Sequence, residues 1–188
     1  TDIGGFFGAN INDPEFHELL VRWFEYGCFC PVMRLHGYRW PLQPQYGTTG
    51  GATCVSGAPN EVWSYTDQVC EILSDYLRLR ERMLPYITEL MEEAHKKGTP
   101  VMRPLFYDFP EDKESWNVET EYMFGPKVLV KPITDADARE TDVYLPGGAS
   151  WTNAWTGETF EGGQKVHVAA PIEQIPLFTR DGYKLPMK

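Results

Sequence analysis

The sequence lacks a long apolar run and an excess of basic residues. No apolar stretch approaches the roughly 18 residues of a membrane-spanning helix, and the first residues do not have the pattern of a signal peptide. The 17 lysines and arginines are outnumbered by 27 aspartates and glutamates, which gives a formal net charge of −10. Because such a field repels phosphate backbones and anionic lipid, the composition argues against a nucleic-acid-binding protein and against a membrane-surface protein.

Cysteine is also scarce, with four residues at positions 28, 30, 54 and 70. Cys28 and Cys30 lie too close together for a comfortable disulfide bond. No C-x-x-C pair or nearby C-x-x-H provides the spacing of zinc ligands. We therefore expect Cys28, Cys30, Cys54 and Cys70 to be buried free thiols, with no metal site, and unpaired thiols favour a cytoplasmic compartment.

Aromatic residues, in contrast, are abundant. They make up 14% of the chain, with Trp 6, Tyr 10 and Phe 10. This much apolar surface excludes a disordered tail and is sufficient for one ordinary core or two small ones.

The first half of the sequence has helical patterns around one short apolar run. Asp13 and Pro14 are suited to begin a helix that ends at Gly27. Its apolar residues repeat at intervals of three and four: Phe16, Leu19, Leu20, Trp23 and Phe24. The apolar run from Cys28 to Leu35 then predicts a buried strand that leads into a loop.

A second helical pattern follows a loop of about 20 residues, a length that is uncommon without a function. Asn60 is expected to cap this helix, which runs to Lys97. Pro85 should kink or split the helix, and Gly98 should end it.

Beyond Pro100 the apolar period changes to two, with Gly and Pro turns between short runs. The candidate strands are Val101–Asp108, Tyr122–Phe124, Lys127–Val130, Thr141–Leu145, Trp151–Trp155, Thr159–Phe160, Lys165–Ala169 and Ile175–Thr179. This spacing predicts an antiparallel β-sandwich. The chain therefore divides into an α/β part, residues 1–100, and an all-β part, residues 101–188.

The α/β part is too short to close a sheet of its own. It holds about two strand–helix units, whereas a (β/α)₈ barrel takes about 250 residues. Thr1 opens the sequence without a methionine and inside what reads as a strand, which predicts that the sequence belongs to a longer protein.

Polar residues flank the two apolar strands of this part. Asp2 precedes the residues I-G-G-F, and His36 ends the run M-R-L-H. In a barrel, residues at the carboxyl ends of neighbouring strands converge on one pocket. Asp2 and His36 could hydrogen-bond sugar hydroxyls while Phe6 packs on the sugar ring. The alternatives are structural: a turn former at Asp2, a satisfied histidine at His36 and a core residue at Phe6.

The motifs D-I-G-G-F at residues 2–6 and R-L-H-G at residues 34–37, with a helix between them, resemble glycoside hydrolase family 31. This family contains retaining α-glucosidases and α-xylosidases. The run Y-M-F-G-P-K-V-L-V at residues 122–130 is similar to the start of the family's β-sandwich, and I-P-L-F-T-R-D-G at residues 175–182 is similar to its last strand and turn. The resemblance implies the last βα units of a (β/α)₈ TIM barrel followed by an antiparallel β-sandwich.

The resemblance also implies that Asp2, Phe6 and His36 line the −1 sugar subsite. For Arg34, which lies in the same motif, an ion pair supporting the strand end is favoured over a contact with the sugar. Arg39, Trp40 and the loop through Gly57 are expected either to rim the pocket or to form a packed loop without a ligand.

The family's catalytic residues are missing from the sequence. Its nucleophile lies in a D-M-N-E-like motif and its acid/base lies in a later G-D loop, and both precede D-I-G-G-F. Neither motif occurs here. Retaining hydrolysis needs two carboxyl groups about 5 Å apart, so we expect no catalytic residue in this chain and no activity from it alone.

The resemblance thus implies partners of three kinds. The substrate is a glycoside or oligosaccharide with a terminal, non-reducing α-linked xylose or glucose, and hydrolysis needs no cofactor. The remainder of the catalytic barrel is the second partner. Open barrel edges also leave assembly into a homo-oligomer as an option.

The alternative is a non-catalytic carbohydrate-binding or interaction module centred on the sandwich. It is suggested by the missing catalytic motifs and by Trp151 and Trp155, whose spacing would place both indoles on one strand face. Exposed, they could stack on a sugar, but burial in the core is the favoured interpretation.

Overall fold

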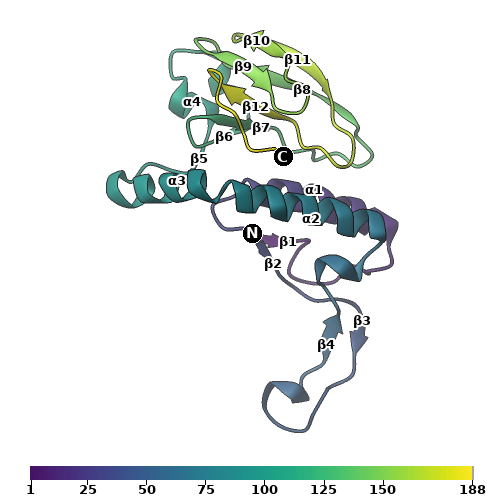
Figure 1. The fold of residues 1–188 in the computed structure, drawn as a ribbon. Coiled ribbons are helices and arrows are strands. Elements are labelled where there is room, and N and C mark those ends of the chain that lie inside the picture. The colour runs from purple at the N-terminus through teal and green to yellow at the C-terminus, as the bar shows by residue number, and fades with distance from the viewer. Residues whose placement is uncertain (188) are drawn as a thin grey trace.

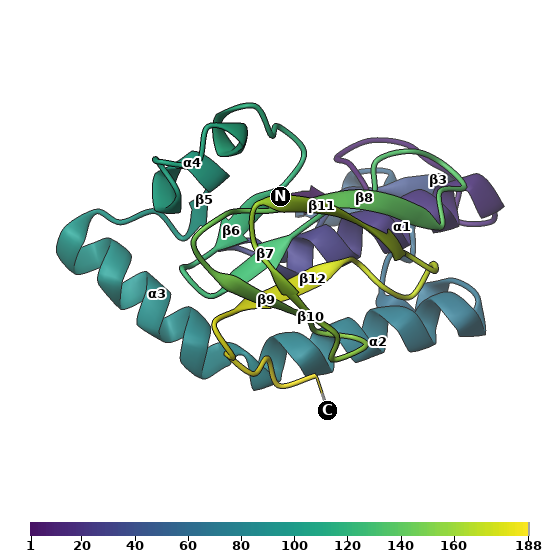
Figure 2. The ribbon, with the colours of Figure 1, turned by 90° about the horizontal axis from the view of Figure 1, so that it is seen from above.

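A computed structural model describes residues 1–187, and Figure 1 shows its three layers. An antiparallel sheet forms one outer layer and three helices form the middle layer. A pair of short strands lies on the other side of the helices, and a hairpin projects beyond it. Viewed from above, the sheet lies across the helices (Figure 2).

The helices are α1 (Pro14–Cys28), α2 (Asp67–Arg82), α3 (Leu84–Lys97) and the short α4 (Leu105–Asp108). Single 3₁₀ turns occupy Gly50–Thr53, Val62–Ser64 and Glu114–Trp116. The strands are β1 (Asp2–Ile3), β2 (Arg34–Leu35), β3 (Arg39–Gln43), β4 (Ser56–Ala58), β5 (Met102–Arg103), β6 (Tyr122–Phe124), β7 (Val128–Val130), β8 (Glu140–Leu145), β9 (Ser150–Asn153), β10 (Thr159–Glu161), β11 (Gln164–Ala169) and β12 (Leu177–Arg180).

The helix ends follow their sequence signals, with one exception. Asp13 caps α1 by accepting from the Glu15 N–H at 3.0 Å. Pro85 lies in the first turn of α3, where its missing N–H costs nothing, so α2 and α3 are separate helices. Gly98 ends α3 in the left-handed conformation. The prediction that Asn60 caps α2 is wrong because α2 begins later, at a cap formed by Thr66.

The all-β part contains a six-stranded sheet in the order β10-β9-β12-β7-β6-β5 and a separate pair, β8–β11. Neighbouring strands are antiparallel throughout. Met123, Leu129 and Phe178 share a core with Val143 and Leu145 of β8, so the pair packs on one face of the sheet. The barrel in the other part is not closed, since β1 and β2 form only a two-stranded sheet.

The opposite face of the six-stranded sheet packs on the helices. Phe124, Val128 and Val130 belong to one buried cluster with Leu20 of α1 and Leu73 of α2. Alternate residues of β6 and β7 therefore face the helices and the β8–β11 pair in turn, as the two-residue period of a strand requires. One core thus spans both parts of the chain.

A buried polar cluster lies within this contact. The Arg22 guanidinium of α1 donates to the carbonyl oxygens of Ala170 at 2.7 Å and Ala138 at 3.0 Å, and also lies 3.1 Å from the Glu25 carboxylate. The Tyr76 hydroxyl of α2 donates to Glu25 at 3.1 Å and accepts from the Ile175 N–H at 3.1 Å. Side chains of both helices are therefore tied to the segment before β12.

Two expected strands are mostly not strands. The run Cys28–Leu35 gives the end of α1, a turn and only the two residues of β2. Cys28 and Phe29 are buried because they face the core from a helix end, not from a sheet. In Val101–Asp108, only Met102 and Arg103 are in a strand, and α4 follows.

The cysteines are unpaired, as expected, but they do not share one environment. Cys28 and Cys30 are buried and Cys70 is half-buried. Cys54 is exposed on the projecting hairpin, so the expectation of burial is wrong there. Within residues 1–187, no helix has the length and apolarity needed to cross a membrane.

Candidate functional site

The strands β1 and β2 bring the two sequence motifs together. They pair in parallel, with Asp2 opposite Arg34 and Ile3 opposite Leu35, so the segments after both strands begin at one edge. The Nε of Arg34 lies 3.4 Å from Oδ1 of Asp2, and both side chains are partly exposed. The ion pair favoured for Arg34 is therefore present.

Beyond this edge the two segments touch through their backbones. The Tyr38 N–H donates to the Phe6 carbonyl oxygen at 3.3 Å. Gly37 has a φ of 101°, and a Cβ at this position would lie 2.4 Å from the Gly5 carbonyl oxygen. Because real Cβ atoms do not approach an oxygen this closely, glycine at position 37 is a condition of the contact.

Phe6 and His36 lie beside one another as a result. Their ring centroids are 5.2 Å apart, with an angle of 46° between the planes. Within the described residues Phe6 is 49% exposed and His36 is half-buried. An aromatic face and an imidazole thus lie side by side, a combination that can bind a ring with apolar faces and hydroxyl edges.

Arg39 follows this pair but does not lie on a rim. Its side chain is fully buried, contrary to the expectation that it borders the pocket. Its Nη1 donates to the carbonyl oxygens of Gly5 at 2.9 Å and Tyr38 at 3.2 Å. Its Nη2 donates to those of Ile3 at 3.1 Å and His36 at 3.4 Å. The guanidinium is thus bonded to both motif segments.

Asn60 is a further residue of this site whose role the sequence did not reveal. Its Nδ2 donates to the Gly37 carbonyl oxygen at 3.1 Å, and its Oδ1 accepts from the Tyr65 hydroxyl at 2.5 Å. Burial raises the pKa of Tyr65, so its hydroxyl stays protonated and available as a donor. Asparagine is a common helix cap, and Asn60 precedes a helical pattern. The sequence therefore predicted a cap at this position.

Trp40 is the second residue of β3, in the β3–β4 hairpin. This hairpin projects from the rest of the chain (Figure 1). The Trp40 side chain is 45% exposed. The backbone N–H of Trp40 donates to the Ala9 carbonyl oxygen at 2.8 Å, and the backbone carbonyl oxygen of Trp40 accepts from the Ile11 N–H at 3.1 Å. The hairpin is therefore attached to the segment that follows the first motif, and the prediction that Trp40 rims the pocket stays a prediction.

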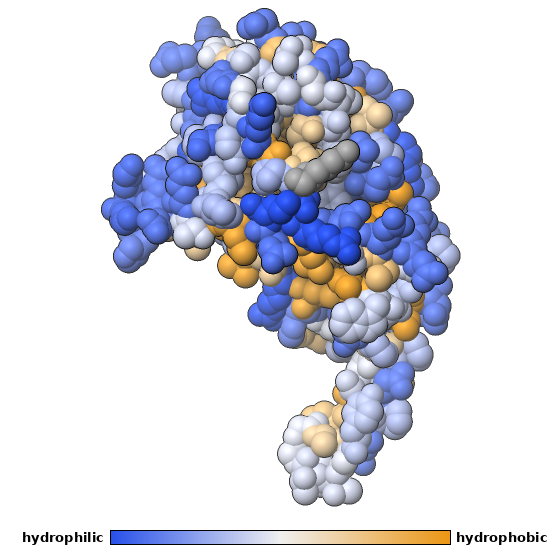
Figure 3. All heavy atoms as spheres, viewed as in Figure 1, coloured by the Kyte–Doolittle hydropathy of each residue, from blue (hydrophilic) through white to orange (hydrophobic). Residues whose placement is uncertain are grey.

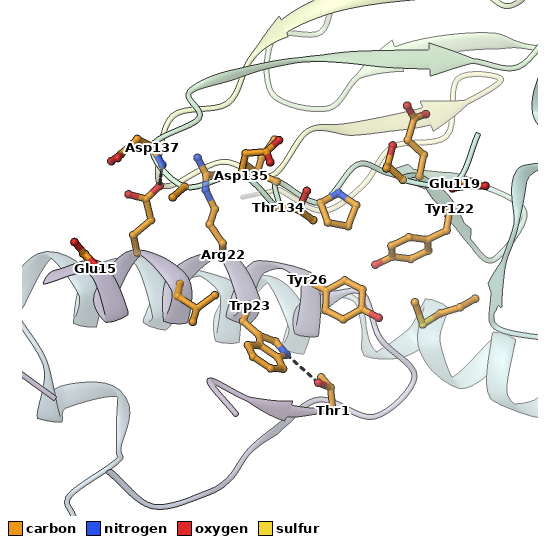
Figure 4. A pocket seen from close by; sticks show the side chains of 18 of the residues that line it. Thr1, Glu15, Arg22, Trp23, Tyr26, Glu119, Tyr122, Thr134, Asp135 and Asp137 are labelled. Atoms are coloured by element: carbon orange, nitrogen blue, oxygen red, sulfur yellow. Dashed lines mark hydrogen bonds between the residues drawn. The ribbon is translucent and has the colours of Figure 1, made fainter. Parts of the chain in front are cut away.

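A cavity lies elsewhere in the chain. It has a volume of about 1080 Å³ and lies between α1 and the segment 132–137, with Trp23, Tyr26 and Tyr122 along it (Figure 4). Leu19 and Trp23 of the expected apolar stripe line this cavity; Leu19 is exposed, whereas Trp23 is partly buried and also packs against the core. Asp2, Phe6 and His36 are not among its lining residues, so it is distinct from the site at the strand ends.

Trp151 and Trp155 of the all-β part do not form an exposed pair. Trp151 is fully buried, and its indole N–H donates to the Pro146 carbonyl oxygen at 2.9 Å, so the core interpretation is confirmed. Trp155 lies beyond the end of β9 and is half-buried, and its indole N–H donates to the Ile175 carbonyl oxygen at 2.7 Å. The chain as described, residues 1–187, holds no cluster of three or more His, Cys, Asp or Glu able to bind a metal ion.

Two family models match the chain. Residues 1–90 match the TIM-barrel domain of glycosyl hydrolases family 31, and residues 98–185 match the C-terminal domain of the same family. These two matches lie in the order that the sequence motifs predict.

Similar proteins point to the same family. An α-xylosidase from Saccharolobus solfataricus is 37% identical over 187 residues, 100% of this chain and 23% of that protein. Alpha-glucosidase 2 from Bacillus thermoamyloliquefaciens is 36% identical over 96% of this chain and 20% of its own length. The crystal structure of a family 31 α-xylosidase from a soil metagenome, complexed with xylose, superposes with a TM-score of 0.93. The two sequences are 48% identical. The matched region covers 98% of this chain and 28% of the α-xylosidase.

The chain therefore spans about a quarter of the length of the relatives that it matches first. Its homologues are α-xylosidases and α-glucosidases, and the resemblance read from its motifs is confirmed. This chain belongs to glycoside hydrolase family 31.

Proposed function

We propose that this chain supplies part of the −1 sugar subsite of a retaining α-glycosidase that releases terminal, non-reducing α-linked xylose or glucose. One observation carries the proposal. The parallel pairing of β1 with β2 places Asp2 opposite Arg34, and in the segments that follow these strands the rings of Phe6 and His36, 30 residues apart in sequence, lie side by side. A xylose complex of a relative with 48% identity supports xylose as a sugar of suitable size.

Each of the three side chains has a distinct role in this proposal. Phe6 packs on the apolar face of the pyranose ring. His36 and Asp2 bind sugar hydroxyls, and the partly exposed Arg34 keeps the Asp2 carboxylate oriented through their 3.4 Å contact. The half-exposed Trp40 borders the entrance next to the hairpin.

The carboxyl groups that perform the displacement lie outside this chain in the proposal. A retaining mechanism uses one carboxylate as nucleophile and one carboxyl group as acid/base, about 5 Å apart across the scissile bond. The chain lacks the family motifs for both groups. They belong to the rest of the barrel, with which residues 1–100 complete the sheet as the last βα units. Residues 101–188 form the β-sandwich that follows.

The proposal predicts that sugar contacts fail when Asp2 or His36 is shortened. In the complete enzyme, Asp2→Ala and His36→Ala each lower kcat/KM for p-nitrophenyl α-xyloside or α-glucoside by about 10²-fold. The reason is that a hydrogen bond involving a charged group is worth roughly 1.5–3 kcal/mol.

The matched controls are Asp75→Ala, an exposed aspartate paired with Arg78, and His167→Ala, an exposed histidine paired with Asp142. Both controls should keep wild-type kinetics. The 188-residue chain alone should hydrolyse neither glycoside above a buffer blank. Wild-type kinetics in Asp2→Ala and His36→Ala, or turnover by the purified chain alone, would refute the proposal.

A further inference from the structure

The Arg39 guanidinium links the two motif segments through hydrogen bonds to their backbones. Of its four carbonyl acceptors, Ile3 and Gly5 belong to the segment after β1, while His36 and Tyr38 belong to the segment after β2. The two carbonyl groups at positions 5 and 36 directly adjoin the residues whose rings form the candidate subsite, Phe6 and His36. A shift of the guanidinium would therefore change the positions of both rings.

The arginine is buried without a carboxylate partner. Among residues 1–187, no Asp or Glu lies within 4.0 Å of its guanidinium, so the four carbonyl oxygens compensate its charge. Burying a charge is costly unless it is hydrogen-bonded, and only the planar, five-donor guanidinium can reach several acceptors in a fixed fork. A buried cation devoted to the backbone fixes the positions of those four peptide groups.

The surroundings of Arg39 match this role. Gly4 has a φ of 82°, and a Cβ there would lie 2.6 Å from Nη2, so the absent side chain gives the guanidinium access to the carbonyl of Ile3. The Phe16 ring of α1 lies 5.1 Å from the Arg39 Cζ, which is within the range of a cation–π contact. The arginine is therefore held by helix α1 as well as by the two segments.

We propose that Arg39 is a positioning residue of the sugar subsite: it fixes Phe6 and His36 relative to one another without contacting the sugar. The proposal rests on the proposed function, because it assigns these two rings to the −1 subsite. Replacing Arg39 should lower the complementarity of the subsite to the sugar even where the protein stays folded. A displacement of 1 Å in such a site is enough to lower the rate by orders of magnitude.

The first experiment compares wild type, Arg39→Met, Arg39→Lys and Arg78→Met in the complete enzyme. Arg78→Met is the matched control because Arg78 is an exposed arginine on α2. The informative quantity is the inhibition constant of free xylose, measured together with KM. Both are independent of the concentration of folded enzyme, so a loss of stability alone leaves them unchanged.

We expect the inhibition constant of xylose to rise at least about tenfold in Arg39→Met and by less in Arg39→Lys, which keeps the charge and some donors. Arg78→Met should match wild type. An inhibition constant within twofold of wild type in folded Arg39→Met overturns the proposal. If Arg39→Met does not fold, Arg39→Lys decides alone: a rise supports the proposal and an unchanged value overturns it.

The second experiment separates this proposal from the proposed function. In the 188-residue chain, NMR should detect nuclear Overhauser contacts between the rings of Phe6 and His36, whose centroids are 5.2 Å apart. These contacts should disappear in Arg39→Met, weaken in Arg39→Lys and persist in Arg78→Met. Undiminished contacts in folded Arg39→Met, or in Arg39→Lys where Arg39→Met does not fold, overturn the positioning role. If they are lost in Arg39→Met but the wild-type enzyme binds no xylose, the proposed function fails and the role of Arg39 in holding the two segments remains.

Discussion

Glu25 is a carboxyl group inside the apolar contact between helix α1 and the sheet. It is fully buried, with Arg22 and Tyr76 as hydrogen-bond donors. Burial raises the pKa of Glu25 from its ordinary 4.5 to about 8, against the opposing influence of the Arg22 charge. Folding thus favours the protonated form of this side chain.

The raised pKa predicts how stability depends on pH. Between about pH 4.5 and about 8 the folded chain holds a proton on Glu25 that the unfolded chain has released. The free energy of unfolding should therefore fall as pH rises through this window and level off above pH 8. In Glu25→Gln the slope should be smaller, because glutamine does not titrate.

Urea unfolding of both proteins between pH 5 and pH 8.5 measures this difference. Glu121, whose pKa burial raises to about 7, adds a slope of the same sign. It is present in both proteins, so the difference between their slopes belongs to position 25. Parallel curves for wild type and Glu25→Gln would show that Glu25 is charged in the folded state throughout this range.

Single residues differ in how far the sequence reveals them. Asp2, Phe6 and His36 could be predicted as subsite residues because the motifs that contain them resemble those of a known family. The role of Arg39 was not identifiable, because its four carbonyl partners come together only when two distant segments touch. An arginine also has a long flexible stem, so sequence alone does not decide whether its head lies in solvent or in the interior.

At the scale of elements, local signals predicted helix ends better than strands. Asp13, Pro85 and Gly98 mark boundaries correctly because caps and prolines act through neighbouring backbone atoms. The run Cys28–Leu35 was misassigned because a short apolar stretch fits a buried helix end as well as a strand. Its burial depends on α2 and on β6, which lie far away in sequence.

The cap of α1 gives a prediction at this scale. Asp13→Ala removes the acceptor of the Glu15 N–H and should lower the free energy of unfolding by about 1 kcal/mol. Asp13→Ser, which retains an acceptor oxygen, should recover most of this loss. Asp75→Ala, at an exposed position within α2, should change stability by less than about 0.5 kcal/mol.

Urea unfolding at one pH compares these three variants with wild type. If Asp13→Ala and Asp75→Ala are equally stable, the side-chain cap seen at the start of α1 does not contribute to folding. The comparison of the two alanine variants removes the effect of losing one negative charge from an acidic chain.

At the scale of the whole molecule, the division near residue 100 separates two family domains, but one of the two buried clusters spans both of them. Helices α1 to α3 and strands β6, β7 and β12 contribute to one buried cluster. Arg22 adds hydrogen bonds across the same contact. The sequence could predict that the apolar period changes from helical to strand-like. It could not predict which helix faces contact which sheet face, because this depends on the packing of the two parts.

The side of the helix layer that faces away from the six-stranded sheet is packed against less of the chain. Figure 3 shows apolar side chains gathered at the surface between the helices and the projecting hairpin. The strands β1 and β2 pair only with each other among the described residues. Both have an outer edge with unpaired backbone groups, where further barrel strands would pair in the enzyme that we propose.

This arrangement predicts an uneven distribution of local stability in the isolated chain. Amide hydrogens of Leu129 and Val130 should exchange most slowly, because β7 is paired on both sides and fully buried. Amides in the middle of α1, such as those of Leu20 and Phe24, should exchange almost as slowly, since they open only when the shared core opens. The amide of Leu35 should exchange much faster, because β2 has a single two-residue neighbour and no cover on its outer edge.

Hydrogen exchange of the 188-residue chain, followed by NMR or mass spectrometry, tests this order. If α1 exchanges as fast as β2 while β7 stays protected, the all-β part is stable by itself and the common core contributes little. If Leu35 is as protected as Leu129, the open barrel edge is stabilised within the isolated chain, for example by pairing between copies. The predicted order is that α1 and β7 are protected together while β2 exchanges fast. This result would locate the region that depends on the rest of the proposed barrel at β1, which contains Asp2, and at β2, which precedes His36.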